Sequence, residues 1–263
     1  MIRADSKPMM RMRIQSGFTL VELLVVIAII SLLTMIIAPS MGKARDMANN
    51  VTCMNNLRNL GKGMGLYHSE NRDEFWPCTL YNTPKRGVTT YFWGTNTDPV
   101  DTSESPLLKT SSAPLSALWC PEQPWGTYVP QGGVSEPTTN YGYNAWCLDP
   151  PAWGRKNQAG EPMRCKKRND IANPNELFVF ADSAMYWAPG GVGIMQNSTH
   201  LEPVSGTWMQ TPTTHFRHNG RANALCADGS ADSYGPEGWE FSGQYKDVKL
   251  GFVGTENYPH YDQ

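Results

Sequence analysis

Residues 16–38 read Ser-Gly-Phe-Thr-Leu-Val-Glu-Leu-Leu-Val-Val-Ile-Ala-Ile-Ile-Ser-Leu-Leu-Thr-Met-Ile-Ile-Ala, and Glu22 is the single charged residue in this run. A helix rises about 1.5 Å per residue, so Phe18 to Ala38 extends about 31 Å and matches the roughly 30 Å hydrocarbon core of a bilayer. The stretch therefore predicts a membrane-spanning helix. Because a carboxylate in such a span costs about 3 kcal/mol, we expect Glu22 to have a function that offsets this cost.

The segment before Phe18 is basic: it contains one acidic residue, Asp5, and the basic residues Arg3, Lys7, Arg11 and Arg13. Basic residues next to a span stay on the cytoplasmic side. We therefore expect a single-pass protein of the cytoplasmic (inner) membrane with a cytoplasmic amino terminus. The carboxyl-terminal domain is then periplasmic or part of an extracellular fibre.

The sequence Gly17-Phe18-Thr19-Leu20-Val21-Glu22, followed by the apolar run, resembles the processing site of type IV pilins and type II secretion pseudopilins. In that family a prepilin peptidase cuts after the glycine and methylates the new amino terminus. The resemblance implies cleavage between Gly17 and Phe18, N-methylation of Phe18, and Glu22 as the fifth mature residue. An ordinary secretory signal is cut after its apolar region. Here the site precedes that region, so the mature protein keeps its span.

The same resemblance implies the partners: a prepilin peptidase, other pilin-like subunits of the same or different kind, an inner-membrane secretion platform and the lipid bilayer. Our hypothesis is that Glu22 pairs with the amino terminus of Phe18 in a neighbouring subunit and so sets the register of a fibre. The alternative is a single-pass anchor that tolerates a glutamate near its end.

Composition divides the chain near residue 75, because 18 of the 20 prolines and all nine tryptophans follow it. We predict a prepilin leader at 1–17, a transmembrane half-helix at 18–38, an exported half-helix at 39–75 and a globular periplasmic domain at 76–263. Removing the leader changes the net charge from −2 to −5. A mildly acidic chain without a basic cluster argues against nucleic-acid binding.

Beyond Pro39 the helical pattern continues to near Glu70. Pro39 removes a backbone donor, so we expect it to kink or loosen the helix. Apolar residues spaced by three or four predict one buried face: Met47, Val51, Met54, Leu57, Leu60, Met64 and Tyr67. Glycines at 61, 63 and 65 either weaken the last turns or admit a closely packed strand.

Short strand signals alternate with turn signals in the exported region: Thr89 to Trp93, Glu176 to Ala181, Thr213 to His218, Arg221 to Ala227 and Ser230 to Tyr234. The economical arrangement is an antiparallel sheet packed on the second half of the long helix. We therefore predict an α+β, pilin-like fold with large irregular loops.

The segment Thr214 to Ser230 contains two turn signals. Asn219-Gly220 suits a type I′ hairpin turn, which needs positive φ at both central positions. Asp228-Gly229 predicts a second turn of the same kind, and together they predict a three-stranded meander. Nine residues separate His218 from Asp228.

This spacing resembles the H-x9-D-G box, formed here by His218, Asp228 and Gly229, of a large subgroup of pilin-like proteins. The helix sequence Met54 to Gly61 and the Trp119-Cys120-Pro121 element resemble that subgroup as well. The resemblance carries no enzymatic activity, so we predict that the protein is not an enzyme and has no cofactor.

Two metal-binding roles are alternatives to this structural prediction. His215, His218 and Asp228 suggest a metal hydrolase, but histidines three apart on a strand point to opposite faces. We therefore predict no metal there, with His218 bonding a turn and Asp228 closing one. The acidic residues at the end of the helix are Glu70, Asp73 and Glu74. They suggest either a calcium site or a turn exposed to solvent, and we favour the turn.

All six cysteines lie beyond the span, and an even number in an oxidising compartment predicts up to three disulfides. We expect Cys147 to pair with Cys165 across a proline- and glycine-rich loop, and Cys53 to pair with Cys120. The alternative is that some remain buried thiols.

Aromatic residues are abundant, with nine tryptophans and 11 tyrosines. Clusters at 91–93 and 141–146 suggest either a core built from large rings or a surface that stacks glycans, and we favour the core. The main functional prediction is a pilin-like (pseudopilin) subunit of a type II secretion pseudopilus or type IV pilus-like fibre. The alternative is a membrane-anchored exported domain that binds carbohydrate or another envelope ligand.

Overall fold

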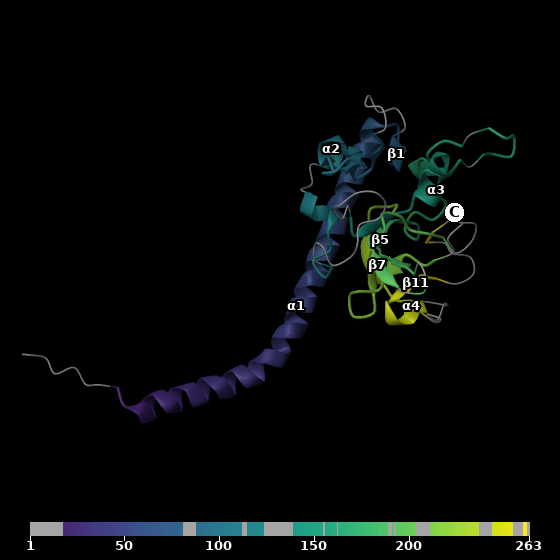
Figure 1. The fold of residues 1–263 in the computed structure, drawn as a ribbon. Helices are drawn as coiled ribbons and strands as arrows, with labels where there is room; N and C mark the ends of the chain where they lie inside the picture. Colours follow the sequence, from purple (N-terminus) through teal and green to yellow (C-terminus); the bar gives the residue numbers. More distant parts are fainter. Residues whose placement is uncertain are drawn as a thin grey trace, which may run out of the picture. The chain divides into compact units, whose positions relative to one another are not determined.

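The computed structural model describes residues 18–80, 88–111, 115–123, 139–154, 156–161, 163–188, 191, 193–203, 211–236, 244–254 and 260–261 (Figure 1). The chain forms two compact units, Met1–Arg45 and Asp46–Gln263. The long helix α1 (Leu20–Glu70) contributes to both. Antiparallel sheets and loops follow it, so the protein has the predicted α+β, pilin-like layout.

The first unit begins its helix with a capping box. Thr19 Oγ1 accepts a hydrogen bond from the Glu22 backbone N–H at 3.2 Å, and Glu22 Oε2 accepts one from the Thr19 N–H at 2.8 Å. This reciprocal arrangement satisfies donors that a helix start otherwise leaves unpaired. Glu22 therefore stabilises the start of α1 whatever else it does.

The apolar side chains of the first unit are exposed, from 45% at Val26 to 79% at Leu20. The most apolar window of α1 has a mean hydropathy of 2.9, and none of it is buried. Exposing an apolar surface of this extent to water is unfavourable, so these residues are consistent with a single-pass membrane anchor. Pro39 lies within the helix.

In the second unit, α1 buries one face at Cys53, Leu57, Leu60, Gly61, Gly63, Met64 and His68. The predicted stripe is correct from Leu57 onward but wrong at its start, because Met47 and Val51 are exposed. Cys53 takes the inward position instead. The helix packs into a core with Tyr141, Phe180 and Leu225 of the main sheet.

The main sheet is antiparallel and has the order β10-β9-β5-β4. Its strands are β4 (Tyr141–Tyr143), β5 (Phe178–Asp182), β9 (Ala222–Cys226) and β10 (Ala231–Tyr234). Side chains alternate between two cores: Leu225 joins α1, whereas Ala224 and Cys226 join a second cluster with Phe216 and Tyr261. Both faces of β5 and β9 are therefore buried.

Smaller elements complete the second unit. Its short strands are β1 (Thr79–Leu80), β2 (Thr90–Tyr91), β3 (Gly94–Thr95), β6 (Met185–Trp187), β7 (Ile194–Gln196), β8 (Thr214–His215) and β11 (Leu250–Gly251). The short helices are α2 (Pro106–Ser111), α3 (Ala145–Leu148) and α4 (Gln244–Asp247). The 3-10 turns are η1 (Thr102–Glu104), η2 (Leu115–Leu118), η3 (Pro150–Trp153) and η4 (Arg168–Asp170).

The carboxyl-terminal meander differs from the prediction. β9 and β10 do form a hairpin, but β8 pairs with β11, and β9 takes β5 as its second neighbour. Only an isolated bridge joins His218 to Arg221 on the first side. The prediction paired β9 with the strand before it in sequence, whereas β9 pairs with β5, whose five residues are all buried.

The two predicted turns also differ from each other. Asn219 (φ 52°) and Gly220 (φ 78°) both have positive φ, as a type I′ turn requires. At the second turn, among the described residues, Gly229 has positive φ (92°) but Asp228 does not. The Gly229 N–H donates to Cys226 O at 3.0 Å, which indicates a three-residue loop with a glycine bulge instead of a second type I′ turn.

Gly61 lets α1 approach the main sheet closely. A Cβ on this residue would lie 2.9 Å from Leu225 Cδ1 and 3.2 Å from Gly229 O. A Cβ on Gly65, by contrast, would meet no atom within 4 Å. Of the two predicted roles of these glycines, a weaker helix end or close packing of a strand, Gly61 has the second.

The aromatic clusters belong to the core. Phe92, Trp93, Tyr141 and Tyr143 are all buried, and Phe92 packs on Tyr143 and Phe180 with ring centroids 5.3 and 5.6 Å apart. These rings are not available to stack on a glycan. The core interpretation of these four residues is therefore confirmed.

Candidate functional site

The processing site lies at the start of the first unit. Gly17 is outside the described residues, whereas Phe18 is exposed. Glu22 follows on the first helical turn, with Oε2 also accepting a hydrogen bond from Thr19 Oγ1 at 2.8 Å. Within the part of the chain that the structure describes, Oε1 accepts none. One carboxylate oxygen is thus free to meet a group from outside the chain.

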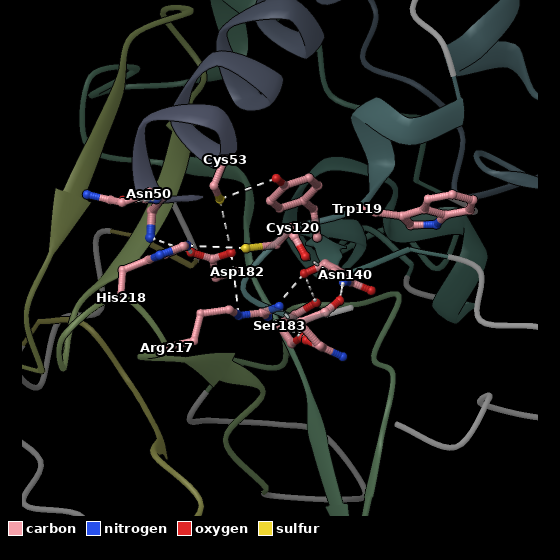
Figure 2. A network of polar contacts seen from close by, with 12 residues as sticks. Asn50, Cys53, Trp119, Cys120, Asn140, Asp182, Ser183, Arg217 and His218 are labelled. Carbon is pink, nitrogen blue, oxygen red and sulfur yellow. Dashed lines mark hydrogen bonds and ion pairs between the residues drawn. The ribbon is translucent and has the colours of Figure 1, made fainter. Parts of the chain in front are cut away.

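A second site lies in the globular unit, where four ionisable side chains converge (Figure 2). Each offers one sulfur, nitrogen or oxygen atom, and these atoms all lie within 4.8 Å of one another. We call them the buried cluster: Cys53, Cys120, Asp182 and His218.

Each member of the buried cluster comes from a different element. Cys53 lies on the inward face of α1, and Cys120 follows η2. Asp182 ends β5. The type I′ turn holds His218, whose backbone N–H and C=O both pair with Arg221 at 3.0 Å.

Polar residues of α1 hold these elements together. Asn56 Nδ2 donates to Trp119 O at 3.0 Å, which fixes the backbone next to Cys120. Asn50 Oδ1 accepts from Asn223 Nδ2 at 2.7 Å, which ties the helix to β9. The asparagines that flank the apolar stripe therefore position the site.

The contacts within the buried cluster are short. Cys53 Sγ lies 3.4 Å from Asp182 Oδ1, and His218 Nε2 lies 3.3 Å from Asp182 Oδ2 and 3.3 Å from Cys120 Sγ. Two further donors point inward: Tyr141 Oη donates to Cys53 Sγ at 3.2 Å, and the Asn223 N–H donates to Asp182 Oδ2 at 2.8 Å.

Arg217 supplies a buried positive charge beside the cluster. Its Nε lies 3.6 Å from Asp182 Oδ1, and one terminal nitrogen donates to Ser183 O at 2.6 Å and Asn140 O at 3.2 Å (Figure 2). The other terminal nitrogen donates to Gln123 Oε1. These bonds offset the desolvation of the guanidinium.

The electrostatics favour the charged forms of Asp182, His218 and Cys120 and the neutral form of Cys53. Burial alone would raise the pKa of Asp182, but Arg217 and His218 hold that pKa below its usual value. Burial would lower the pKa of His218, yet Asp182 raises it to about 9. Burial raises the pKa of Cys53, whereas hydrogen bonds with Cys53 and His218 outweigh burial and lower the pKa of Cys120.

The structure separates the residues of the H-x9-D-G box. The backbone of His218 bonds Arg221 across the turn, but its side chain joins the buried cluster. Asp228 stays exposed and accepts from Ser230 N at 2.8 Å in its own loop. His215 is buried on β8 and lies outside the cluster. Residues on both sides of β9 nevertheless lie close to α1. His218, before the strand, lies near Cys53, and Gly229, after the strand, lies near Gly61.

Asp182 was not predicted as a site residue. It directly follows the apolar run Leu177 to Ala181, and a carboxylate at the end of a buried strand is the signal that could have indicated it.

The cysteine pairings were predicted as disulfides, and the structure shows thiols. Cys165 Sγ donates to Asp149 Oδ1 at 3.3 Å, so its predicted bridge to Cys147 is not formed here. Cys53 and Cys120 are also unbridged, although their sulfur atoms lie within 4.8 Å of each other. Formation of either bridge under oxidising conditions stays a prediction.

The acidic residues after α1 do not join such a cluster. Glu74 Oε1 lies 3.9 Å from Lys167 Nζ, and Asp73 takes a positive φ of 62° in the turn. The turn is therefore present, and the absence of a calcium ion from it stays a prediction.

Comparison with known protein families gives one match. Residues 12–38 match the prokaryotic N-terminal methylation motif. This match supports a type IV pilin-like protein that is processed by prepilin peptidase and assembles with pilin-like subunits. It indicates a structural subunit. The match ends within the first unit, and neither a curated protein nor a solved structure matches the chain.

Proposed function

We propose that this protein is a pseudopilin-like subunit of a type II secretion pseudopilus or a type IV pilus-like fibre. Prepilin peptidase cuts between Gly17 and Phe18 and methylates Phe18, and the mature chain stays in the cytoplasmic membrane through α1. Its globular unit then lies in the periplasm. The observation that carries the proposal is the methylation motif at residues 12–38, which from Leu20 onward forms an exposed apolar helix.

Assembly follows from the chemistry of the new amino terminus. Cleavage creates a positively charged amine on Phe18, and no side chain of the same span except Glu22 carries the opposite charge. In hydrocarbon, an unpaired carboxylate and an unpaired ammonium are both costly. A neighbouring subunit that brings its Phe18 amine to Glu22 Oε1 removes both costs, while Oε2 keeps its capping bonds to Thr19.

The capping role of Glu22 offers a competing explanation, so the test separates charge from capping. We expect Glu22→Gln, which keeps a carbonyl acceptor for the cap but loses the charge, to reduce fibre incorporation about tenfold or more, equivalent to roughly 1.4 kcal/mol. Thr19→Val removes the hydroxyl of the cap but keeps the carboxylate, and it should leave incorporation within about twofold.

The measurement is the fraction of the protein in sheared fibres relative to the membrane, in cells that carry the complete secretion or pilus machinery. Peptidase cleavage, read from the apparent size, serves as a control and should be normal in both variants. Normal incorporation of Glu22→Gln would rule out the pairing, and equal defects in both variants would assign Glu22 to capping alone.

A further inference from the structure

We propose that the globular unit binds one structural zinc ion. The four ligands are the members of the buried cluster: Cys53, Cys120, Asp182 and His218. This inference goes beyond the proposed function and does not depend on fibre assembly. It departs from our prediction, made from the sequence around His215, His218 and Asp228, that this region holds no metal.

The donor set identifies the class of ion. Two cysteine sulfurs, one imidazole nitrogen and one carboxylate oxygen are the atoms that zinc takes in protein sites, usually four at a time. Calcium and magnesium prefer oxygen ligands throughout and would leave the two sulfurs unused. Two thiolates with an imidazole therefore favour zinc.

Three distances between donor atoms are close to those expected across one zinc ion. Standard zinc bond lengths place sulfur about 3.6 Å from nitrogen or oxygen, and nitrogen about 3.3 Å from oxygen, across one ion. The distances here are 3.4 Å for Cys53 Sγ to Asp182 Oδ1, 3.3 Å for Cys120 Sγ to His218 Nε2 and 3.3 Å for His218 Nε2 to Asp182 Oδ2. The two Asp182 distances are to different oxygens, and one ligand atom from each of the four residues lies within 4.8 Å of the other three. Binding of one ion therefore needs only a small adjustment of these side chains.

The surrounding groups fit a bound metal. Zinc with two thiolates and one carboxylate carries a net charge of −1, and the Arg217 guanidinium beside Asp182 neutralises it. Ligands of structural metals are commonly held by donors in the next layer. Here the Tyr141 hydroxyl donates to Cys53 Sγ and the Asn223 N–H donates to Asp182 Oδ2.

The site is closed, which indicates a structural role. Catalytic zinc keeps one position open for water or substrate, whereas four protein ligands fill the coordination of a structural zinc. All four ligands are buried, and they come from α1, the segment after η2, the end of β5 and the turn before β9. One ion would thus fasten α1 to the main sheet.

A disulfide between Cys53 and Cys120 is the competing outcome, because exported cysteines usually oxidise. Such a bond draws the two sulfurs to about 2.05 Å and leaves no thiolate for a metal. Zinc and this disulfide therefore exclude each other.

The first test measures zinc and thiols on the same sample. Full-length protein is purified in detergent without chelators or added metal, zinc is measured by elemental mass spectrometry, and thiols are alkylated before peptide mapping. The proposal predicts stoichiometric zinc with Cys53 and Cys120 both reduced. Absence of zinc, whether these two cysteines are bridged or free, would overturn it.

Matched variants locate the ion. Cys120→Ser should lower the zinc content about tenfold or more. Cys226→Ser is the control, because Cys226 is equally buried but pairs with Tyr234 Oη at 3.3 Å and lies outside the cluster. It should keep its zinc, and equal zinc in the two variants would contradict the assignment.

A spectroscopic test remains decisive if Cys120→Ser does not fold. Wild-type protein stripped of metal and loaded with Co²⁺ should show the intense visible bands of tetrahedral cobalt with a thiolate-to-metal charge-transfer band, and added Zn²⁺ should abolish both. Absence of these bands in folded protein would overturn the proposal.

Discussion

Replacing Leu57 with alanine is expected to lower the free energy of unfolding of the globular unit by about 2–5 kcal/mol. Leu57 lies on α1, is 0% exposed and packs in the core that joins the helix to the main sheet. Truncation removes apolar contacts and leaves a cavity that the rigid helix and sheet cannot close. Chemical denaturation of the full-length protein in detergent, followed by tryptophan fluorescence, gives the measurement.

Leu66→Ala is the matched control for this prediction. It makes the same chemical change on the same helix, but Leu66 is 54% exposed. Its effect should stay within about 0.5 kcal/mol. Similar losses in the two variants would mean that α1 does not pack as described.

Replacing Arg217 with methionine is expected to cost about 3–5 kcal/mol of folding free energy, because it leaves Asp182 as a buried charge without its guanidinium partner. The same change removes the donors that satisfy Ser183 O and Asn140 O. The cost therefore includes unpaired backbone acceptors as well as the lost charge.

Arg221→Met serves as the comparison, because Arg221 is also an arginine of the turn region but is exposed and bonds Ser233. A change of less than about 1 kcal/mol is expected there. The free energies of unfolding are compared through the denaturation midpoints of the two variants and the wild type. A loss in Arg217→Met no larger than in Arg221→Met would contradict the buried network.

The sequence was sufficient for features that depend on local patterns. The apolar run predicts the long helix, the stripe from Leu57 to Met64 predicts its buried face, and Asn219-Gly220 predicts the type I′ turn. In each case the spacing of a few neighbouring residues determines the outcome. The large aromatic rings were likewise expected in the core, because a loop-rich domain has few other means to bury surface.

Features that depend on distant residues were not predictable in this way. β8 pairs with β11, and β9 pairs with β5, because tertiary packing selects partners that no local turn indicates. The buried cluster draws on residues 53, 120, 182 and 218, and no spacing among them matches a short metal motif. His218 was noticed for its box, but only the fold brings it to Asp182.

The two units have different roles in the proposed function. The first unit carries the methylation motif and the exposed apolar surface, and in the proposed function it inserts into the membrane and packs against the helices of other subunits. The second unit fastens the continuation of α1 to a sheet through the core, the asparagine contacts and the buried cluster. If the subunit joins a fibre as proposed, these contacts within the second unit keep the continuation of α1 attached to the sheet.

The intact mass of the protein isolated from its native membrane tests the central claim most directly. We expect a chain that starts at Phe18, lacks residues 1–17 and carries one added methyl group on its amino terminus. A chain that still begins at Met1, with Phe18 unmodified, would contradict it.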